Sequence, residues 1–219
     1  MKILYQFASR SRPQNFFRGM DSIVRNSVNL DYRIHVVSDW DDHTMNDSTT
    51  IARLKDYPNT EICFGKSTSK INAINRLPQV TEDIIVNMSD DMLFTHNGFD
   101  EIIRQGFRDY FPDLDGAIHF PDGRQGANCM TMSIIGRKYF ERDNYIYHPS
   151  YESLWCDLEA QEVAQSRGKY KYIDLQIFKH LHPSFGDAPM DAQYEKTESH
   201  QVRSKDEVVY RTRKANNFL

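Results

Sequence analysis

The sequence predicts an α/β fold built as one domain. Short strand-like runs alternate with segments of helical period along the chain, which is typical of a sheet covered by helices. A chain of 219 residues, 39% of them apolar, is long enough to bury one substantial core, and no internal repeat or low-complexity linker divides it. We therefore expect a single domain over residues 1–195, followed by a polar tail over residues 196–219.

The first half of the chain predicts strands and helices in alternation. The predicted strands cover residues 2–8, 32–38, 61–64 and 83–88. Ser11 and Pro13 can open a helix after the first strand, and a second helix is expected over residues 70–77. The strand at 83–88 has a continuous apolar centre, as central parallel strands have.

The second half predicts that the sheet is mixed. The expected elements are a helix that begins near Phe99, strands over 116–120 and 130–135, a helix around 151–166, and a strand over 171–178. The chain is polar beyond Gly186. We expect the tail to pack on the domain or cover its site, as a helix near 205–214 or as a mobile lid.

Composition argues against several classes of partner. Lys and Arg number 27 against 31 Asp and Glu, and the net charge of -4 gives no general attraction to nucleic acid or to an anionic membrane. Three cysteines, odd in number and far apart, fit a reducing compartment, so we expect a cytoplasmic protein. The start of the chain is too short and polar for a signal peptide, and no apolar run approaches the roughly 20 residues of a spanning helix.

Charged clusters follow three of the predicted strands: Ser9-Arg10-Ser11-Arg12, Asp39 and Ser89-Asp90-Asp91. In an open α/β sheet, ligands bind beyond the carboxyl ends of the strands. Two adjacent carboxylates after a buried strand repel each other and lose solvation, which a cation or several hydrogen-bond donors can offset. Mg²⁺ or Mn²⁺ suits such oxygen ligands and is shared with substrate phosphates. The alternative is that the two acids cap a helix.

Two histidines, His180 and His182, lie near the end of the last predicted strand. Alternate residues of a strand share a face, so both point the same way only if extended geometry continues to Pro183. A histidine that completed a set of Asp, Asp and His would favour Mn²⁺ over Mg²⁺. The alternative is a structural histidine, and the sequence leaves open which of the two would bind metal.

No glycine motif for phosphate is present, because the chain has neither G-x-G-x-x-G nor G-x-x-x-x-G-K-[ST]. Positive charge at a phosphate must therefore be local. A metal at Asp91 would supply it, together with nearby cations: Arg10, Arg12, Lys66 and Lys70. Each of these cations can equally be a solvated surface charge. Asp39 can accept a hydrogen bond from a base or ribose, or it can be a turn residue.

Four segments, in this order, carry a family resemblance: Phe7-Ala8-Ser9-Arg10-Ser11-Arg12-Pro13, Val37-Ser38-Asp39, Lys70-Ile71-Asn72-Ala73-Ile74-Asn75 and Met88-Ser89-Asp90-Asp91-Met92. They resemble the glycosyltransferases of the GT-A fold, with family two as the closest comparison. The resemblance covers about residues 1–195. It implies that Ala8, Arg10 and Asp39 hold a nucleotide, and that Asp91, with Asp90 beside it, holds Mn²⁺ or Mg²⁺. Serine replaces the first acid of the family's D-x-D-like motif, so Asp91 is the expected ligand.

The resemblance extends to an acceptor-side segment and a closing segment. Residues 147–159 resemble the segment in which an acid opens a helix under the acceptor sugar. A carboxylate within reach of an acceptor hydroxyl can take its proton, and we expect Asp157 in this role with Glu159 as the reserve. The alternative is an exposed acid on an amphipathic helix. His180-Leu181-His182-Pro183, followed by Asp191 and Tyr194, is similar to the family's closing metal histidine and donor-side lid.

The sequence therefore predicts a metal-dependent enzyme that transfers a sugar from a nucleotide-diphosphate donor, with uridine diphosphate as the usual carrier, to a glycan or other hydroxyl. Transfer with inversion is expected if Asp157 is the base. Two alternatives stay open: a sugar nucleotidyltransferase, although the first turn lacks the usual glycines, and a non-catalytic nucleotide- or carbohydrate-binding module. Transfer to modified DNA bases is a third, since the tail carries basic residues: Arg203, Lys205, Arg211, Arg213 and Lys214.

Overall fold

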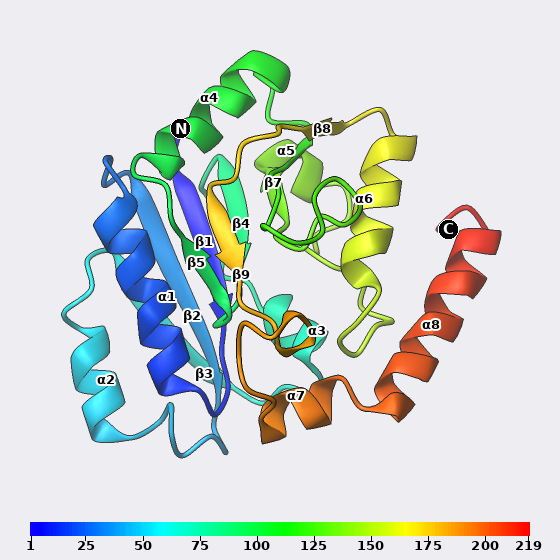
Figure 1. The fold of residues 1–219 in the computed structure, drawn as a ribbon. Helices are drawn as coiled ribbons and strands as arrows, with labels where there is room; N and C mark the ends of the chain where they lie inside the picture. The colour runs from blue at the N-terminus through cyan, green and yellow to red at the C-terminus, as the bar shows by residue number, and fades with distance from the viewer.

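A seven-stranded sheet runs through the centre of the molecule (Figure 1). The computed structural model describes residues 1–219. The strands of this sheet are β1 (Ile3–Ala8), β2 (Tyr32–Asp39), β3 (Thr60–Gly65), β4 (Ile84–Met88), β6 (Ala117–His119), β7 (Ile134–Gly136) and β8 (Tyr170–Tyr172). Their spatial order is β3-β2-β1-β4-β7-β6-β8, and only β7 runs antiparallel to its neighbours. The predicted α/β class with a mixed, mostly parallel sheet is confirmed.

A second, two-stranded sheet and the helices complete the fold. The small antiparallel sheet pairs β5 (Met92–Phe94) with β9 (Phe178–His180). The helices are α1 (Pro13–Asn26), α2 (Ser48–Leu54), α3 (Lys70–Ile74), α4 (Phe99–Tyr110), α5 (Arg137–Phe140), α6 (Cys156–Ser166), α7 (Ala192–Thr197) and α8 (His200–Ala215), with a 3-10 turn at Pro183–Phe185. None of the helices combines the length and apolar character that crossing a bilayer requires.

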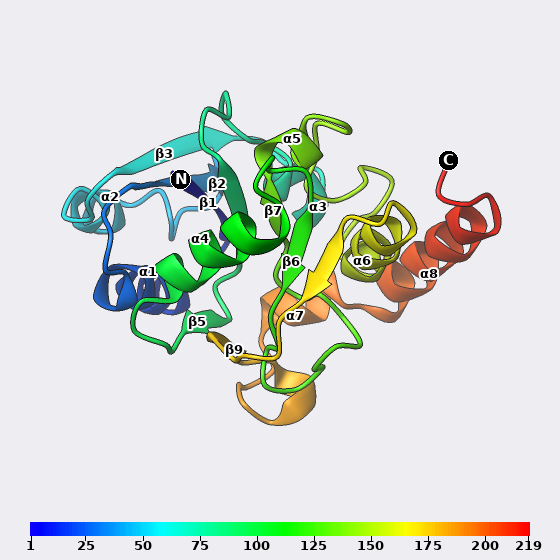
Figure 2. The same ribbon diagram turned by 90° about the horizontal axis from the view of Figure 1, so that it is seen from above.

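The two faces of the sheet bury two separate cores because successive strand residues point to opposite sides. Tyr5 and Phe7 of β1 belong to the larger core, which α1 and α4 cover (Figure 2). Leu4, the neighbour of Tyr5, belongs to the smaller core, with contributions from α3, α5, α6 and α8. The central parallel strands β1 and β4 are therefore covered on both faces, and polar side chains beyond their carboxyl ends are the ones left to line a site.

Several elements differ from the sequence-based expectation, and the strand predicted over 130–135 covers only Ile134–Gly136. The segment predicted as one strand over 171–178 contributes to two sheets, because Ile173 is the last residue bonded to β6, through His119, and the chain then crosses to pair with β5. The helix expected from residue 151 begins at Cys156, because Trp155 has a positive φ of 65°, which interrupts a right-handed helix. The tail forms α8, longer than the helix expected near 205–214.

A buried ion pair ties α4 to the beginning of the sheet. The Arg104 and Asp100 side chains are 1% and 0% exposed, with 2.6 Å between Arg104 Nη1 and Asp100 Oδ2. Arg104 also donates to the carbonyl oxygens of Met1 and Asp31. Asp100 accepts the backbone N–H of Val28. The pair thus joins α4, the start of β1 and the α1–β2 connection.

We expect Arg104→Met to lower the free energy of unfolding by about 3–5 kcal/mol, because it leaves the buried Asp100 carboxylate without its cation. Urea denaturation measures the change. Arg108→Met is the matched control, since Arg108 lies one turn further along α4 and is 44% exposed; its effect should stay within about 0.5 kcal/mol. Equal losses in the two variants would contradict a special role for the buried pair.

Candidate active site

Two cavities open side by side at the carboxyl ends of β1, β2 and β4. The larger has a volume of about 430 Å³ and the smaller about 270 Å³. Five residues line both cavities: Ala8, Lys70, Ser89, Asp91 and Ser153. The acidic turn Ser89-Asp90-Asp91, which was predicted as a ligand site, therefore lies where the two cavities meet.

Asp90 and Asp91 follow β4 and are both buried. Neither caps a helix. Asp90 accepts hydrogen bonds from Ser9 Oγ at 3.0 Å and from Arg12 Nη1 at 3.1 Å. Asp91 Oδ2 accepts the hydroxyl of Tyr194 at 2.8 Å, whereas its Oδ1 is buried without any partner. The structure thus does not support the alternative in which Asp90 and Asp91 cap a helix.

The two neighbouring carboxylates have opposite pKa shifts. Burial, together with the charge of Asp91, raises the pKa of Asp90 to about 6. Burial acts in the same direction on Asp91, but the hydrogen bond and charge of His180 outweigh it and hold the pKa of Asp91 well below its usual range. Asp91 therefore stays charged to lower pH than Asp90, and a charged carboxylate is what a cation ligand must be.

His180 reaches Asp91 because β9 pairs with β5 in a register that places His180 opposite Met92, the residue after Asp91. His180 Nε2 lies 3.4 Å from Asp91 Oδ2, and Nδ1 lies 3.6 Å from Asp122 Oδ2. Burial lowers the pKa of His180, but the nearby carboxylates of Asp122 and Asp91 raise it overall to about 9, so a metal ion bound to this ring would have to displace its proton.

His182 has both ring nitrogens engaged elsewhere. Its Nδ1 accepts the backbone N–H of Ser184, and its Nε2 lies 2.7 Å from Glu198 Oε1. It lines the smaller cavity, but the ring nearest to Asp91 belongs to His180. Of the two histidines that the sequence left open, His180 is the one that faces the acidic turn.

The protein supplies only part of the ligands that a divalent cation would need. No group of three or more His, Cys, Asp or Glu side chains is arranged to hold a metal ion. The unpartnered Oδ1 of Asp91, with the nearby His180, fits two positions of an ion that takes its other ligands from a substrate or from water. The donor set is thus compatible with Mn²⁺ or Mg²⁺ bound together with a diphosphate.

The far end of the larger cavity is formed by Asp39, the last residue of β2. Arg10 Nη1 donates to its Oδ2 at 2.9 Å, and Arg76 Nη1 lies 3.4 Å from its Oδ1. Arg76 also donates to the carbonyl of Ser38 and to Ser67 Oγ, so it fixes the end of β2 against the following loop. Sequence reasoning missed Arg76, because nothing near it in the chain shows that its partners come from β2.

Segment α7 closes over the larger cavity through Arg12. The guanidinium of Arg12 donates from Nε to Asp191 Oδ2 at 2.8 Å and lies 3.8 Å from the centre of the Tyr194 ring. Asp191 caps α7, and the hydroxyl of Tyr194 reaches Asp91. Burial lowers the pKa of Arg12, but Asp191 and Asp90 raise it overall. The positive charge of Arg12 is thus paired with these two carboxylates. Arg12 therefore holds the closing segment in place.

Two lysines leave cations exposed at the larger cavity. Lys70 begins α3 and lines both cavities, and Lys196 of α7 lines the larger one. Beside Lys196, the first residues of α8 face the same space, including Gln201 and Val202. Lys66, in contrast, is exposed and lines neither cavity. Among the predicted phosphate cations, Lys70 is the one that the fold places between the cavities.

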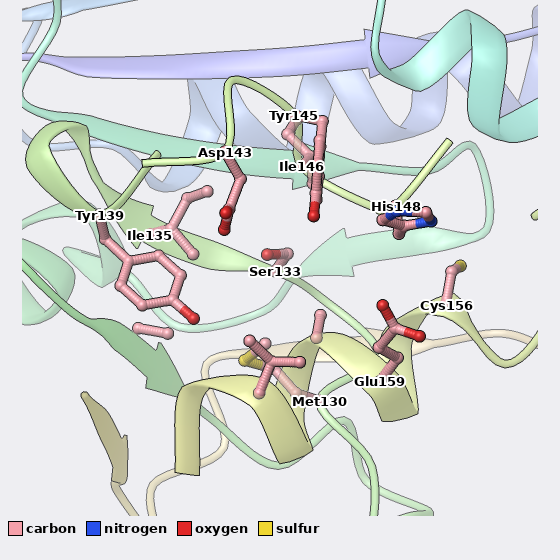
Figure 3. Close-up of a pocket in the computed structure, with 13 residues that line it drawn as sticks. Met130, Ser133, Ile135, Tyr139, Asp143, Tyr145, Ile146, His148, Cys156 and Glu159 are labelled. Carbon is pink, nitrogen blue, oxygen red and sulfur yellow. The ribbon is translucent and has the colours of Figure 1, made fainter. Parts of the chain in front are cut away.

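Asp157 and Glu159 point to different places, although both belong to the first turn of α6. Asp157 lines the smaller cavity. Glu159 lines a separate cavity of about 40 Å³ (Figure 3), where it accepts the hydroxyl of Tyr151 at 2.6 Å and pairs with Arg213 Nε at 3.0 Å. Asp157 thus lines the same smaller cavity as Asp91, whereas Glu159 does not.

Asp122 is a second residue that sequence reasoning missed. It is buried, and its carboxylate accepts the backbone N–H groups of Arg124 and Gln125 as well as the hydroxyl of Thr131. Burial raises the pKa of Asp122, but the nearby His180 and the backbone hydrogen bonds lower it overall to about 2. Because the Asp122 carboxylate lies next to His180 Nδ1, the other ring nitrogen, Nε2, is directed at Asp91.

Solved structures share this fold. No protein-family model matches the chain, and no curated protein matches it. A crystal structure of TarS 1-349 from S. aureus in complex with UDP-GlcNAc superposes with a TM-score of 0.64 at 11% identity, over 90% of this chain and 63% of that one. The mannosyltransferase PcManGT from Pyrobaculum calidifontis, in complex with GDP-Man and Mn²⁺, gives a TM-score of 0.61 at 13% identity, over 80% and 54%.

The chain is shorter than these proteins. Against a longer crystal structure of S. aureus TarS the TM-score is 0.62 at 9% identity, and the match covers 81% of this chain but only 36% of the other. The chain thus spans between about one third and two thirds of the lengths of the structures that it matches. Sequence identities this low establish the architecture alone. The predicted fold is confirmed: the chain has the GT-A fold of nucleotide-sugar glycosyltransferases.

Proposed function

We propose that the chain is a glycosyltransferase that moves a sugar from a nucleotide-diphosphate donor, with uridine diphosphate as the carrier, to an acceptor hydroxyl. One observation carries the proposal: Asp91, with a buried oxygen that has no partner, lies at the junction of two cavities. Group transfer needs two substrates that meet at one point, and this junction provides it.

The larger cavity suits the donor. Its volume of about 430 Å³ lies within the range of small-molecule sites. Asp39 at one end can accept a hydrogen bond from a base or ribose, and Lys70 and Lys196 supply positive charge for phosphates. The matched structures that contain UDP-GlcNAc or GDP-Man support a nucleotide sugar as the ligand.

Asp91 and His180 would hold the divalent cation with the donor. When bound, Mn²⁺ or Mg²⁺ supplies positive charge that stabilises the departing diphosphate. A nitrogen ligand favours Mn²⁺ over Mg²⁺, and the mannosyltransferase complex with Mn²⁺ supports this choice. Asp122 keeps His180 directed at Asp91.

The smaller cavity suits the acceptor, and Asp157 is the base that we assign to it. A carboxylate in this position can take the proton of an acceptor hydroxyl as the oxygen attacks the sugar carbon. The attack comes from the side opposite the diphosphate, so the configuration of the sugar is inverted. Glu159 has no part in this step, because its carboxylate is held by Tyr151 and Arg213 outside the cavity.

We expect Asp91→Asn to abolish the release of nucleoside diphosphate from a UDP-sugar, because the amide replaces the charged ligand of the cation. Release is measured with and without Mn²⁺ over a panel of UDP-sugars. A donor at 100 times its dissociation constant should stabilise the wild-type protein by about 2.7 kcal/mol in a thermal-shift measurement. Asp56→Asn is the control, since Asp56 is exposed and lines neither cavity.

The same assay separates the alternatives. A binding module would bind the nucleotide sugar without releasing nucleoside diphosphate under any condition. A nucleotidyltransferase would instead release pyrophosphate from a nucleoside triphosphate and a sugar phosphate. Release by Asp91→Asn at the wild-type rate would contradict the proposed role of this carboxylate.

We expect Asp157→Asn to slow sugar transfer by about 10²–10⁴-fold, the usual contribution of a general base. The assay uses 4-nitrophenyl glycosides as acceptors, and donor binding should persist because Asp157 does not line the larger cavity. Asp109→Asn, an exposed substitution on α4, should transfer at the wild-type rate. A product that retains the anomeric configuration by NMR would count against Asp157 as the base.

A further inference from the structure

A fully buried carboxylate of α8 binds the loop that precedes α6. Asp206 is 0% exposed. Its Oδ1 accepts the backbone N–H of Glu152 at 2.9 Å, and its Oδ2 accepts those of Ser153 and Leu154 at 2.8 Å each. Three consecutive peptide groups are thus satisfied by one side chain from 52 to 54 residues further along the chain.

This loop forms part of the wall between the two cavities. Glu152 and Ser153 line the larger cavity, whereas Ser153 and Leu154 line the smaller one together with Asp157. Ser153 Oγ is buried without a partner, as is Asp91 Oδ1. The loop therefore presents a free hydroxyl at the same junction at which the proposed transfer takes place.

The loop has few other means of holding this conformation. The carbonyl of Glu152 accepts the N–H of Ile71 in α3, which is the loop's link to the sheet side of the site. Trp155 has a positive φ of 65°, which is uncommon for a residue other than glycine, and its ring stacks on Tyr210 of α8. Both the strained backbone and the three N–H groups thus depend on α8, which lies beside α6 (Figure 1).

We propose that Asp206 is a positioning residue of the transfer site. By binding three consecutive N–H groups it fixes the loop at 152–154, and through the loop it fixes the start of α6, where Asp157 lies. The proposal rests on the proposed function for its kinetic consequence. The structural consequence, an ordered loop, does not depend on that function.

Asp206→Asn tests the proposal, because the amide group presents N–H where the loop needs an acceptor. Hydrogen exchange should show amides 152–154 well protected in the wild-type protein, although they lie outside any helix or strand, and at least about tenfold faster in the variant. In nucleotide release and sugar transfer from a UDP-sugar, kcat should fall at least about tenfold, while KM for the donor changes less than threefold.

Two controls separate positioning from stability. Glu207→Gln lies on the same helix and disrupts only the exposed pair with Arg211, so exchange and kcat should not change. Arg104→Met destabilises the protein far from the loop and should keep the wild-type kcat at temperatures where it is folded. If Asp206→Asn does not fold, Asp206→Ser, which keeps one acceptor oxygen, takes its place in both measurements.

Each outcome decides the question. Faster exchange at 152–154 together with the fall in kcat supports the proposal. Unchanged exchange, or faster exchange with an unchanged kcat, overturns it, and so does a kcat that falls equally in Arg104→Met. If the wild-type protein releases no nucleotide, the proposed function fails; the exchange data and the affinity for UDP in Asp206→Asn still test whether Asp206 orders the cavity wall.

Discussion

Two adjacent carboxylates at the end of a buried strand are the constraint on which the site depends. Asp90 and Asp91 lose solvation together and repel each other, and the fold answers with donors from distant segments. Ser9 and Arg12 from the turn after β1 bind Asp90, whereas Tyr194 from α7 and His180 from β9 approach Asp91. Neutralising these two charges therefore brings three distant segments to one point, and one oxygen of Asp91 is left without a partner.

Sequence patterns predicted the elements that are set by local physics. Periodicity gave the parallel strands and α1, and the rule that ligands bind beyond the carboxyl ends of strands placed Asp39 and Asp91 in one site. Patterns could not show which distant groups meet. Arg12 pairs with Asp191, 179 residues away, and the place of Asp122 beside His180 depends on the course of the chain after β6. The choice between His180 and His182 likewise depended on the register of β9 against β5.

The start of α6 shows how a distant residue overrides a local pattern. Periodicity favoured a helix from residue 151, but Asp206 holds residues 152–154 as a loop, Trp155 adopts a positive φ, and the helix begins at Cys156. Residues two positions apart on a helix lie about 200° apart, so Asp157 and Glu159 face different sides of α6. Asp157 then lines the smaller cavity, while Glu159 turns to Tyr151 and Arg213. The two candidate bases could not be separated until the position of α6 against the two cavities was known.

The polar C-terminal segment docks by hydrogen bonds to charged groups. Its few apolar side chains include Tyr194 and Tyr210, and both also bind a carboxylate. At one end, buried acids of the core receive donors from the segment, as Asp91 receives the hydroxyl of Tyr194. At the other end, the acid belongs to the segment, since Asp206 receives the N–H groups of the core. Hydrogen bonds to charged groups contribute about 1.5–3 kcal/mol each, so a few of them can replace a hydrophobic face. The contacts that close the larger cavity are therefore the same contacts that pair its charged side chains. This explains why so polar a segment packs directly on the site.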